Sequence, residues 1–333
     1  MRMGISVTRL VLVAAALVVT AAASSAPPER LMNQYRKDLP WFRANFHGHA
    51  HSNESACELV RAYVDLGYKV VGVEPWYLDA ARETFADEDV LLISAPEDGS
   101  APGGPGWPHL FAVAPKDVPQ ERQDPKKERT AGLQGRIDSL RDRGALVYIC
   151  HPAWSGIGAG ELRPLTGYIG IEIYNEAVQR INGKGLSLET WDLILADGKR
   201  VWGFAADDAH NVTSLAGRPT VGQGWVVIQA PTLTEEAIIE AIREGRFYSS
   251  MGPRFNSIEV DGSRLEVNTS PCVEVHFVGA GSVGQSFFRP VDSPGTKFVL
   301  DLSKRKWAGS YVRVEITDAS GRKAWSNPLF VKP

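Results

Sequence analysis

The chain has little cysteine and no excess of charge of either sign, and both scarcities exclude classes of protein. Three cysteines among 333 residues rule out a disulfide scaffold and allow one bridge at most. Lys and Arg number 36 against 39 Asp and Glu, so the formal net charge of −3 offers no basic surface for wrapping a nucleic-acid backbone. We therefore expect no binding to duplex nucleic acid, although a small acidic site could still act on a nucleotide or a strand end.

Long apolar runs are also scarce, and the one candidate for a membrane-spanning segment lies at the N-terminus. Residues 10–19 are apolar, follow two arginines and precede the small residues 21–26. This order is that of a secretory signal peptide, and the run is too short for a comfortable membrane span. We expect cleavage near Ala23 or Ala26, export to the periplasm or the extracellular space, and no stable membrane span afterwards. An uncleaved anchor is the alternative.

From residue 45 to about 250, apolar runs rich in β-branched residues alternate with segments of helical periodicity. The predicted strands cover residues 45–49, 69–73, 90–95, 145–150, 170–174, 201–206 and 225–228. The predicted helices cover residues 55–66, 128–143, 187–196 and 234–244. Such alternation predicts an α/β fold with a parallel sheet, either closed into a barrel or open and doubly wound.

After residue 253 the pattern changes to short strands of period two separated by turn residues. These strands cover residues 258–260, 265–267, 273–277, 298–300, 312–316 and 329–331. They predict a small antiparallel sandwich. Residues 279–284 spell the dinucleotide fingerprint Gly-Ala-Gly-Ser-Val-Gly, but that motif needs a helix next, and the following residues have the pattern of a strand and turn. We therefore expect no nucleotide there and no organic cofactor.

Three of the seven histidines stand within the run Asn45-Phe46-His47-Gly48-His49-Ala50-His51. Alternate side chains of an extended strand face the same way, so His47 and His49 can point together. Two imidazoles on one face are half of a metal site, although many such pairs are merely solvated. His51 falls where the strand should turn, and we expect it to contact substrate or to lie in solvent.

Further residues of metal-ligand type follow the ends of the other predicted strands, namely Glu97, His109, His151, Asp207, Asp208 and His210. Each by itself has an ordinary explanation as a turn, a strand end or a helix cap. In a barrel, however, the carboxyl ends of the strands converge on one mouth, where active sites are built. A mixed set of imidazoles and carboxylates favours Zn, Mn or Fe over Ca. Cys150, directly before His151, is a candidate thiol nucleophile, but a buried packing cysteine is the better interpretation.

In this order the motifs His-x-His, Glu, His, His-Pro, Glu-x-x-Asn and Asp-x-His resemble those of the PHP superfamily, named for polymerase and histidinol phosphatase. The resemblance covers roughly residues 45–250, and the sandwich-like tail is similar to that of exported bacterial members and CehA/McbA-type metallohydrolases. It implies a distorted seven-stranded (β/α) barrel and a metal-dependent phosphoesterase. It also implies one ion held by His47, His49, Glu97 and Asp208, and a second held by Glu97, His109 and His151. A hydroxide held between the two ions would attack the ester.

Two departures from the family's pattern lead us to expect two metal ions rather than three. The family usually has Thr-Asp-His after its second strand, where this chain has Val73-Glu74-Pro75, and a histidine that some members carry beyond His-x-His is missing. Both losses fall on the third metal position. His210 is then free to bind substrate or protonate the leaving group, and it joins Glu97 and Asp208 in the predicted catalytic set. Glu74 could supply an oxygen ligand or a base instead.

The remaining candidates are side chains expected near the mouth of the barrel. We predict substrate contacts from His51, Glu74, Trp76, Trp154, Asn175, Arg218 and Arg254. Trp76, Trp107 and Trp154 could form an apolar wall, although core packing explains each almost as well. The two arginines are the nearest basic candidates for a phosphate clamp, and neither lies in a recognisable anion-binding motif.

The sequence therefore predicts an exported hydrolase that uses two divalent ions, Zn, Mn or Fe, on a small-molecule substrate such as a phosphate ester or nucleotide. Its predicted parts are a signal peptide at 1–26, a PHP-like barrel at 27–252 and a sandwich-like domain at 253–333. Because basic residues are scarce at the site, hydrolysis of a carbamate, ester or amide is the first alternative. The second is an inactive metal-containing protein whose sandwich binds a carbohydrate or a partner.

Overall fold

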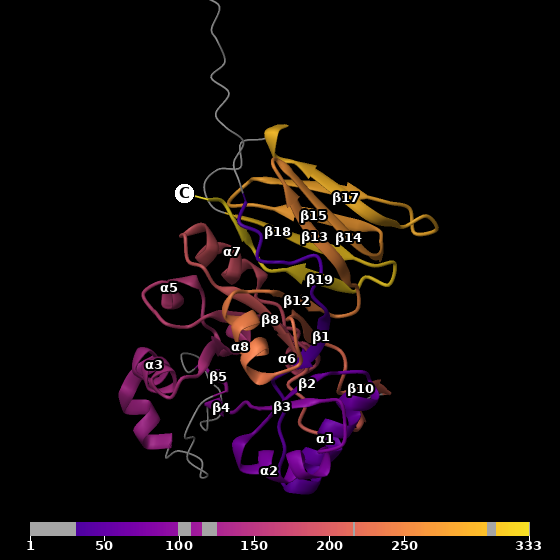
Figure 1. The fold of residues 1–333 in the computed structure, drawn as a ribbon. Coiled ribbons are helices and arrows are strands. Elements are labelled where there is room, and N and C mark those ends of the chain that lie inside the picture. The colour runs from indigo at the N-terminus through magenta and orange to yellow at the C-terminus, as the bar shows by residue number, and fades with distance from the viewer. Residues whose placement is uncertain (1–30, 99–107, 115–124, 216, 305–310, 333) are drawn as a thin grey trace, which may run out of the picture.

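The computed structural model describes residues 31–98, 108–114, 125–215, 217–304 and 311–332. Figure 1 shows a lower body, which holds the β/α part of the chain, and an upper lobe of C-terminal strands. The predicted signal peptide and Trp107 lie outside the described residues, and export stays a prediction. Among the described helices, none is both long and apolar enough to cross a membrane.

The body begins with three parallel strands connected by helices. These elements are β1 (Trp41–Asn45), α1 (Asn53–Asp65), β2 (Val70–Val73), α2 (Pro75–Thr84) and β3 (Leu91–Ser94). β2 has the sequence Val-Val-Gly-Val and is buried along its length, as expected of a parallel strand covered on both faces. Helix α1 begins after Ser52, whose Oγ accepts the backbone N–H of Ser55. Helix α2 was not predicted, although Pro75 stands in its first turn, where proline suits a helix.

A second sheet, of order β4-β5-β6-β7-β8, forms the other half of the body. Its strands are β4 (Glu97–Asp98), β5 (Leu110–Val113), β6 (Leu146–Ile149), β7 (Gly170–Asn175) and β8 (Trp202–Ala206). Strands β6, β7 and β8 are parallel, whereas β4, β5 and β6 pair antiparallel. The helices of this half are α3 (Pro125–Asp142), α4 (Pro152–Ser155), α5 (Ala159–Leu162), α6 (Glu176–Asn182) and α7 (Leu188–Ala196).

The two halves meet differently on their two sides. On one side, backbone hydrogen bonds from Ala114 to Ser94 O (2.8 Å) and from Ala112 to Pro96 O (3.1 Å) connect β5 with β3. On the other side, side-chain hydrogen bonds to β8 replace backbone pairing between strands. Ser249 Oγ donates to Gly203 O, and Gly203 N–H donates to Asn327 Oδ1. The structure is therefore a mixed α/β body of two sheets, and the seven-stranded barrel is not confirmed.

The first sheet also receives antiparallel strands from later in the chain. They are β11 (Trp225–Gln229) and β12 (Phe247–Ser250), with α8 (Glu235–Arg243) between them. Helix α8 begins after Thr234, whose Oγ1 accepts from Ala237, as the sequence predicted. The small hairpin of β9 (Ser214–Leu215) and β10 (Arg218–Pro219) precedes them.

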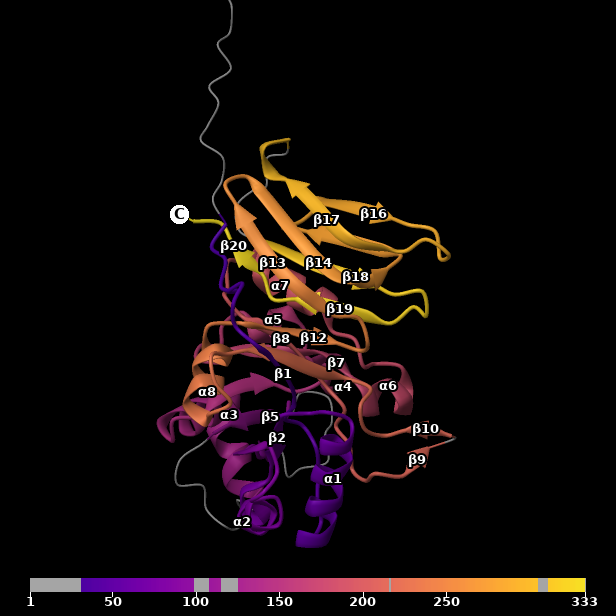
Figure 2. The same cartoon turned by 45° about the vertical axis from the view of Figure 1, so that its right-hand side comes forward.

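The C-terminal strands form two facing layers with an apolar interior (Figure 2). One layer has the order β13-β14-β17, and the other is β16-β15-β18-β19, with β20 paired to β18. The strands are β13 (Phe255–Asp261), β14 (Arg264–Cys272), β15 (Glu274–Val278), β16 (Gly284–Phe288), β17 (Gly295–Asp301), β18 (Tyr311–Thr317), β19 (Lys323–Ser326) and β20 (Leu329–Phe330), with a 3-10 turn at Leu302–Lys304. A strand, β16, follows the fingerprint-like glycines, as predicted. Because β19 pairs with β12, the large sheet runs from the lobe into the body, and the domain boundary at residue 252 stays a prediction.

The lobe is also held to the body by a buried cation. Arg313 of β18 is 2% exposed and binds Asp192 of α7 and Glu315. The Tyr311 hydroxyl donates to the same Asp192 carboxylate at 3.0 Å. Helix α7 therefore belongs to the contact between body and lobe, where both ribbon views place it.

A row of aromatic rings fills the space between the two sheets. Tyr148 and Phe204 stack with ring centroids 4.3 Å apart, Phe111 lies 5.2 Å from Tyr148, and Phe247 lies 4.7 Å from Phe204. All four are at most 1% exposed. The row spans β5, β6, β8 and β12 and so holds the strand ends that carry the predicted ligands.

We expect Phe204→Ala to lower the free energy of unfolding by about 3–5 kcal/mol, because it removes the ring that contacts both Tyr148 and Phe247. The matched control is Phe288→Ala, which changes a side chain that is 64% exposed and should alter stability by about 0.5 kcal/mol or less. Urea unfolding of the two variants measures the difference. Equal urea midpoints for the two variants would show that packing of the aromatic row does not stabilise the body.

Candidate metal centre

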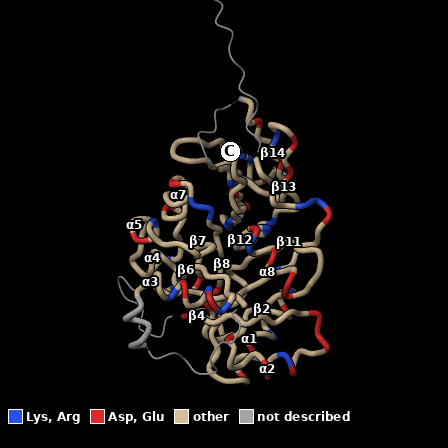
Figure 3. The backbone as a smooth tube through the Cα atoms, turned by 60° about the vertical axis from the view of Figure 1, so that its left-hand side comes forward, with Lys and Arg blue, Asp and Glu red and all other residues tan. Residues whose placement is uncertain are grey.

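The His47–His49 segment leaves β1 and runs beside the end of β8. The backbone N–H of Asp208 donates to His47 O at 3.0 Å, and that of His49 donates to Ala209 O at 2.8 Å. A Cβ on Gly48 would lie 2.9 Å from Leu59 Cδ2, so glycine lets helix α1 approach closely here. Figure 3, a backbone tube in which Asp and Glu positions are red, shows red positions of separate segments close together near the labels β4 and β6.

The first ligand group consists of His47, His49 and Asp208. The two Nε2 atoms lie 3.2 Å apart, and Asp208 Oδ1 lies 3.2 Å from His47 Nε2 and 3.1 Å from His49 Nε2. His47 Nδ1 donates to Glu172 Oε1 at 2.6 Å, so in the neutral ring Nε2 presents a lone pair to the group. Among the described residues, Asp208 Oδ1 is buried and accepts no hydrogen bond. Converging lone pairs around an unsatisfied carboxylate oxygen fit a divalent cation.

The second ligand group is centred on Glu97. Its Oε1 lies 2.8 Å from His109 Nδ1, 3.4 Å from His151 Nε2 and 3.4 Å from His47 Nε2. Its Oε2 faces His49 Nε2 at 3.6 Å, so one carboxylate touches both groups. This is the position of a bridging ligand between two cations.

Cys150 Sγ also lies within 4.8 Å of ligand atoms of the second group. The side chain is fully buried, and burial together with the nearby carboxylates holds the thiol pKa well above its usual range. A protonated, inaccessible thiol cannot act as a nucleophile. The geometry therefore favours the packing interpretation of Cys150. Cys57 and Cys272 are unpaired as well, so the described cysteines form no disulfide.

Glu172 and Asn175, at the end of β7, fix the orientation of the ligands. Glu172 Oε2 accepts from the backbone N–H of His151 and from Asn175 Nδ2, both at 2.9 Å. The same Asn175 Nδ2 lies 3.1 Å from Asp208 Oδ2. His151 and Asp208 have positive φ angles of 28° and 53°, so their backbones are strained at the positions these contacts hold.

The loop that carries Glu97 and His109 is fixed by Arg136 of α3. Arg136 is 3% exposed, and its Nε donates to Asp98 Oδ2 at 3.0 Å while NH1 donates to Pro108 O at 2.9 Å. One guanidinium thereby ties both ends of the segment. Arg136 has no signal in the sequence, because nothing in a helical pattern marks an inward-facing arginine.

The charges of the ligands compensate one another when no cation is present. Burial alone would raise the pKa of Glu97, but His109, His151 and His47 outweigh it and hold that pKa well below its usual range. Burial alone would lower the pKa of His49, but Asp208, Glu74 and Glu97 outweigh it and raise that pKa to about 10. The pKa of His47 is raised in the same way by Asp208 and Glu172. Protons therefore occupy the imidazoles where a cation would bind.

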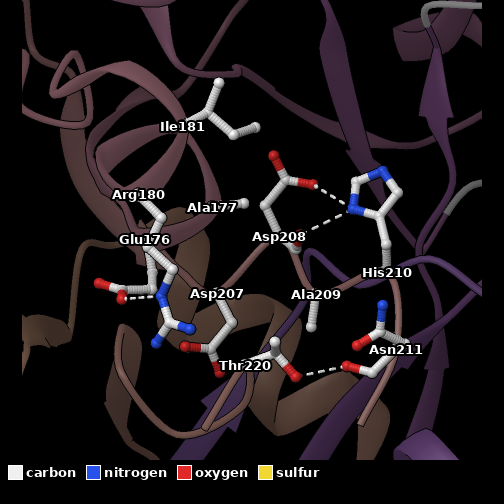
Figure 4. A pocket seen from close by; sticks show the side chains of 10 residues that line it. All are labelled: Glu176, Ala177, Arg180, Ile181, Asp207, Asp208, Ala209, His210, Asn211 and Thr220. Atoms are coloured by element: carbon white, nitrogen blue, oxygen red, sulfur yellow. Dashed lines mark hydrogen bonds and ion pairs between the residues drawn. The ribbon is translucent and has the colours of Figure 1, made fainter. Parts of the chain in front are cut away.

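Asp207 and His210 flank Asp208 but face different surroundings. Asp207 accepts backbone N–H groups of residues 222–224 at 2.7–2.8 Å, so it anchors that loop. Burial raises its pKa to about 6 in spite of these donors. His210 is 57% exposed, and its Nδ1–H donates to Asp208 O at 3.0 Å (Figure 4). Burial and the neighbouring His49 lower the pKa of His210, which leaves its Nε2 as an acceptor near neutral pH.

The structure divides the predicted substrate residues into buried and accessible ones. Glu74 is 5% exposed, accepts from Ala50 N–H and lies 3.7 Å from His49 Nδ1, which favours orienting His49 over touching substrate. Asn175 is fully buried among the ligands, which favours a positioning role as well. Trp154 packs its ring against His109 and His151, at the edge of the second group.

The other predicted contacts lie farther from the cluster. His51 is exposed in the loop before α1, and Trp76 is half-buried in the first turn of α2. Arg218 is exposed on β10. Arg254 is exposed and donates its N–H to Ser270 Oγ within the C-terminal strands, so its described contacts belong to the lobe. The loop side chains were hard to place from sequence because loop direction is set by tertiary contacts.

A family model described as PHP-associated matches residues 195–247, from the end of α7 to the start of β12. This range contains Asp208 and His210. The match confirms the predicted resemblance to the PHP superfamily, and the CehA/McbA-type subdivision stays a prediction. No curated protein matches the sequence.

Three solved structures are similar to the chain at low identity. A two-domain protein containing a predicted PHP-like metal-dependent phosphoesterase from Bacteroides vulgatus has 14% identity and a TM-score of 0.48, over 91% of this chain and 99% of that one. Endonuclease Q has 12% identity and a TM-score of 0.40, over 61% of this chain and 57% of its own. PsfC from Pseudomonas syringae has 11% identity and a TM-score of 0.37, over 61% of this chain and 88% of its own.

One expectation is corrected by these comparisons. The endonuclease Q structure is a complex with a 27-mer duplex substrate that has an abasic lesion at the active site. Our exclusion of duplex nucleic acid was therefore wrong. The physical reason is that a net charge averages over the whole chain and does not decide what can reach one metal site.

We expect Glu172→Gln to weaken divalent metal binding by about 10–100-fold, because the substitution removes the carboxylate that fixes the His47 ring and the His151 backbone. Competition with a chelator measures the affinity. Glu189→Gln on the exposed start of α7 is the matched control and should leave it unchanged. Equal affinities in both variants would contradict the orienting role.

We also expect metal uptake to release protons. The pKa of His49 is about 10 in the metal-free site and that of His47 is raised, so both rings are protonated at neutral pH and a cation must displace those protons. The apparent affinity should therefore rise between about pH 6 and about pH 8 and fall as the pH is lowered. Zinc titration in weakly buffered solution with a pH indicator tests both effects, and pH-independent uptake without proton release would refute them.

Proposed function

We propose that this chain, whose PHP-associated segment carries Asp208 and His210, is a metal-dependent hydrolase of phosphate esters. Two divalent cations, Zn, Mn or Fe, would be held by the two groups that Glu97 connects. The observation that supports the proposal most is this single carboxylate, which faces imidazoles of both groups at 2.8–3.6 Å. Two cations so placed would supply an activated water and stabilise the negative charge that develops on the attacked group.

The chain's own residues prepare the site for this chemistry. Glu172 accepts from His47 Nδ1, so that Nε2 is the nitrogen that loses its proton and faces a cation when one binds. Ser155 Oγ lies 3.3 Å from His151 Nδ1, where it can fix the ring in the same way for the second group. Asn175 keeps Asp208 turned toward the histidines. The ligands are therefore preorganised before any cation binds.

His210 takes a role different from the one its sequence position suggested. Its Nδ1–H is given to the Asp208 carbonyl, and its lowered pKa leaves Nε2 without a proton at neutral pH. Such a ring can accept a proton from water or a hydrogen bond from substrate, but it does not readily protonate a leaving group. We therefore propose His210 as an acceptor.

A second candidate, hydrolysis of a carbamate, ester or amide, is favoured by one specific observation. The guanidinium in the pocket lining that includes Asp208, that of Arg180, is engaged by Glu176 and by two backbone carbonyls. A dianionic phosphate monoester would therefore find no unengaged arginine in the described lining there. The same geometry suits a phosphodiester or a neutral ester better than a monoester.

We also propose that the protein is exported, with residues 1–26 removed, and that it acts in the periplasm or outside the cell. The charged, apolar and small-residue order of that segment supports this location. Fractionation of cells that express the full chain, with mass determination of the product, tests the proposal.

We expect the metal-loaded protein to bind two ions and to hydrolyse 4-nitrophenyl phosphate or bis(4-nitrophenyl) phosphate. Glu97→Ala should lose at least one ion and about two to four orders of magnitude in kcat/KM, since a bridging ligand contributes several kcal/mol of charge stabilisation. Elemental analysis and initial rates measure both.

Exposed Glu236→Ala on α8 is the matched control. Turnover of 4-nitrophenyl acetate or a carbamate alone would support the second candidate. Metal binding without turnover on any ester would contradict catalysis, and two ions in Glu97→Ala would refute the ligand assignment.

A further inference from the structure

A pocket of about 280 Å³ opens beside the metal centre, between α6 and the loop that follows β8. Asp208 and His210 form one wall, and Ala177 and Ile181 of α6 lie opposite them (Figure 4). Because Asp208 belongs to the first ligand group, the pocket is continuous with the site of the proposed reaction. Its volume is close to the lower limit of small-molecule sites, about 300 Å³, and suits one ring-sized group.

The charge of the lining disfavours an anion. Three carboxylates, those of Glu176, Asp207 and Asp208, line the pocket together with one guanidinium, that of Arg180. Arg180 is 11% exposed, its Nε binds Glu176, and its terminal nitrogens donate to the carbonyls of Arg218 and Pro219. The guanidinium therefore lines the cavity, but each of its nitrogens already has a partner that fixes the β10 segment or Glu176.

The remaining lining offers apolar surface and a hydrogen-bond donor. Ile181 is 71% exposed, which is unusual for a large apolar side chain and leaves it available at the pocket. Asn211 Oδ1 accepts both the N–H and the hydroxyl of Thr213. No described hydrogen bond uses Asn211 Nδ2, so this amide can donate to a group in the pocket.

We propose that this pocket binds the uncharged, ring-sized organic substituent of the ester and discriminates against an anionic one. The inference rests on the proposed function, because it places the reacting phosphoryl group at the adjacent metal centre. It deepens that function by naming the substrate class: esters whose second substituent is neutral, with an apolar face and a hydrogen-bond acceptor. The selectivity comes from Ile181, Asn211 and the carboxylates rather than from a positive clamp.

Three non-hydrolysable phosphonates test the inference on the full, metal-loaded chain. The (4-carbamoylphenyl)phosphonate and (4-carboxyphenyl)phosphonate have nearly the same shape and differ in charge, and methylphosphonate has no ring. We expect the carbamoyl compound to bind about tenfold tighter than either of the others by calorimetry. These affinities do not depend on turnover.

Ile181→Lys places a cation at the pocket and should raise the affinity for the carboxy compound about tenfold relative to the carbamoyl compound. Methylphosphonate has no ring to reach the pocket, so its affinity should change less than that of the carboxy compound. The matched control is Leu193→Lys on α7, an exposed leucine outside the pocket lining, which should change none of the three affinities. Both sites are on the surface, so both variants should fold.

The outcomes separate the two proposals. Equal affinities for the carbamoyl and carboxy compounds in the unaltered protein, or no response to Ile181→Lys, would overturn the pocket assignment. Metal-dependent binding of methylphosphonate in that case would leave the proposed function intact. If none of the phosphonates binds while elemental analysis finds two ions, the phosphoesterase proposal fails, and the inference that rests on it fails too.

Discussion

The body of this protein is organised around a buried convergence of lone pairs. Glu97 and Asp208 bring carboxylate oxygens to within 2.8–3.6 Å of imidazole nitrogens. The imidazoles in turn hold the pKa of Glu97 well below its usual range. Groups of this kind are costly to bury unless a cation or protons satisfy them. Every element that ends at the centre therefore needs a contact that opposes the repulsion. The carboxylate of Glu172 and the guanidinium of Arg136 provide those contacts, which also hold His151 at a strained backbone angle.

The turn after β8 serves two purposes at once. Its first residues, Asp207 and Asp208, anchor the next loop and complete the first ligand group. Its later residues, His210 and Asn211, form one side of the pocket against α6. The pocket and the centre are thereby built from the same short segment, so a change in the loop alters both the charge at the cations and the shape that surrounds the substituent. The large sheet continues from this body into the lobe through β12 and β19, and the lobe lies above the body in Figure 1.

Sequence periodicity predicted β2, β3, β6, β7, β8 and β11 because each is a short, largely buried apolar run between turn residues. The strand predicted at residues 45–49 was placed wrongly, because β1 is Trp41–Asn45 and the chain leaves the sheet before His47. Sequence periodicity missed α2, α6, β12 and β19, whose residues are mixed in character and are stabilised by neighbours distant in the chain. The sequence pattern did not predict that the side chains of Ser249 and Asn327 would bond to β8 in place of a paired strand. For this reason the closed barrel is not confirmed. The exclusion of duplex nucleic acid failed because net charge carries no information about position.

The sequence by itself determined the alternation of strands and helices, the change to short antiparallel strands after residue 253, and the placement of His, Glu and Asp at strand ends. These are local properties, since side-chain period and turn chemistry act over a few residues. Only the tertiary structure decided that Glu97 lies between both ligand groups, that Arg180 is engaged by Glu176 and two carbonyls, and that Cys150 is sealed from solvent. Those facts depend on distances between separate segments of the chain, and such distances are set by packing that no local pattern encodes.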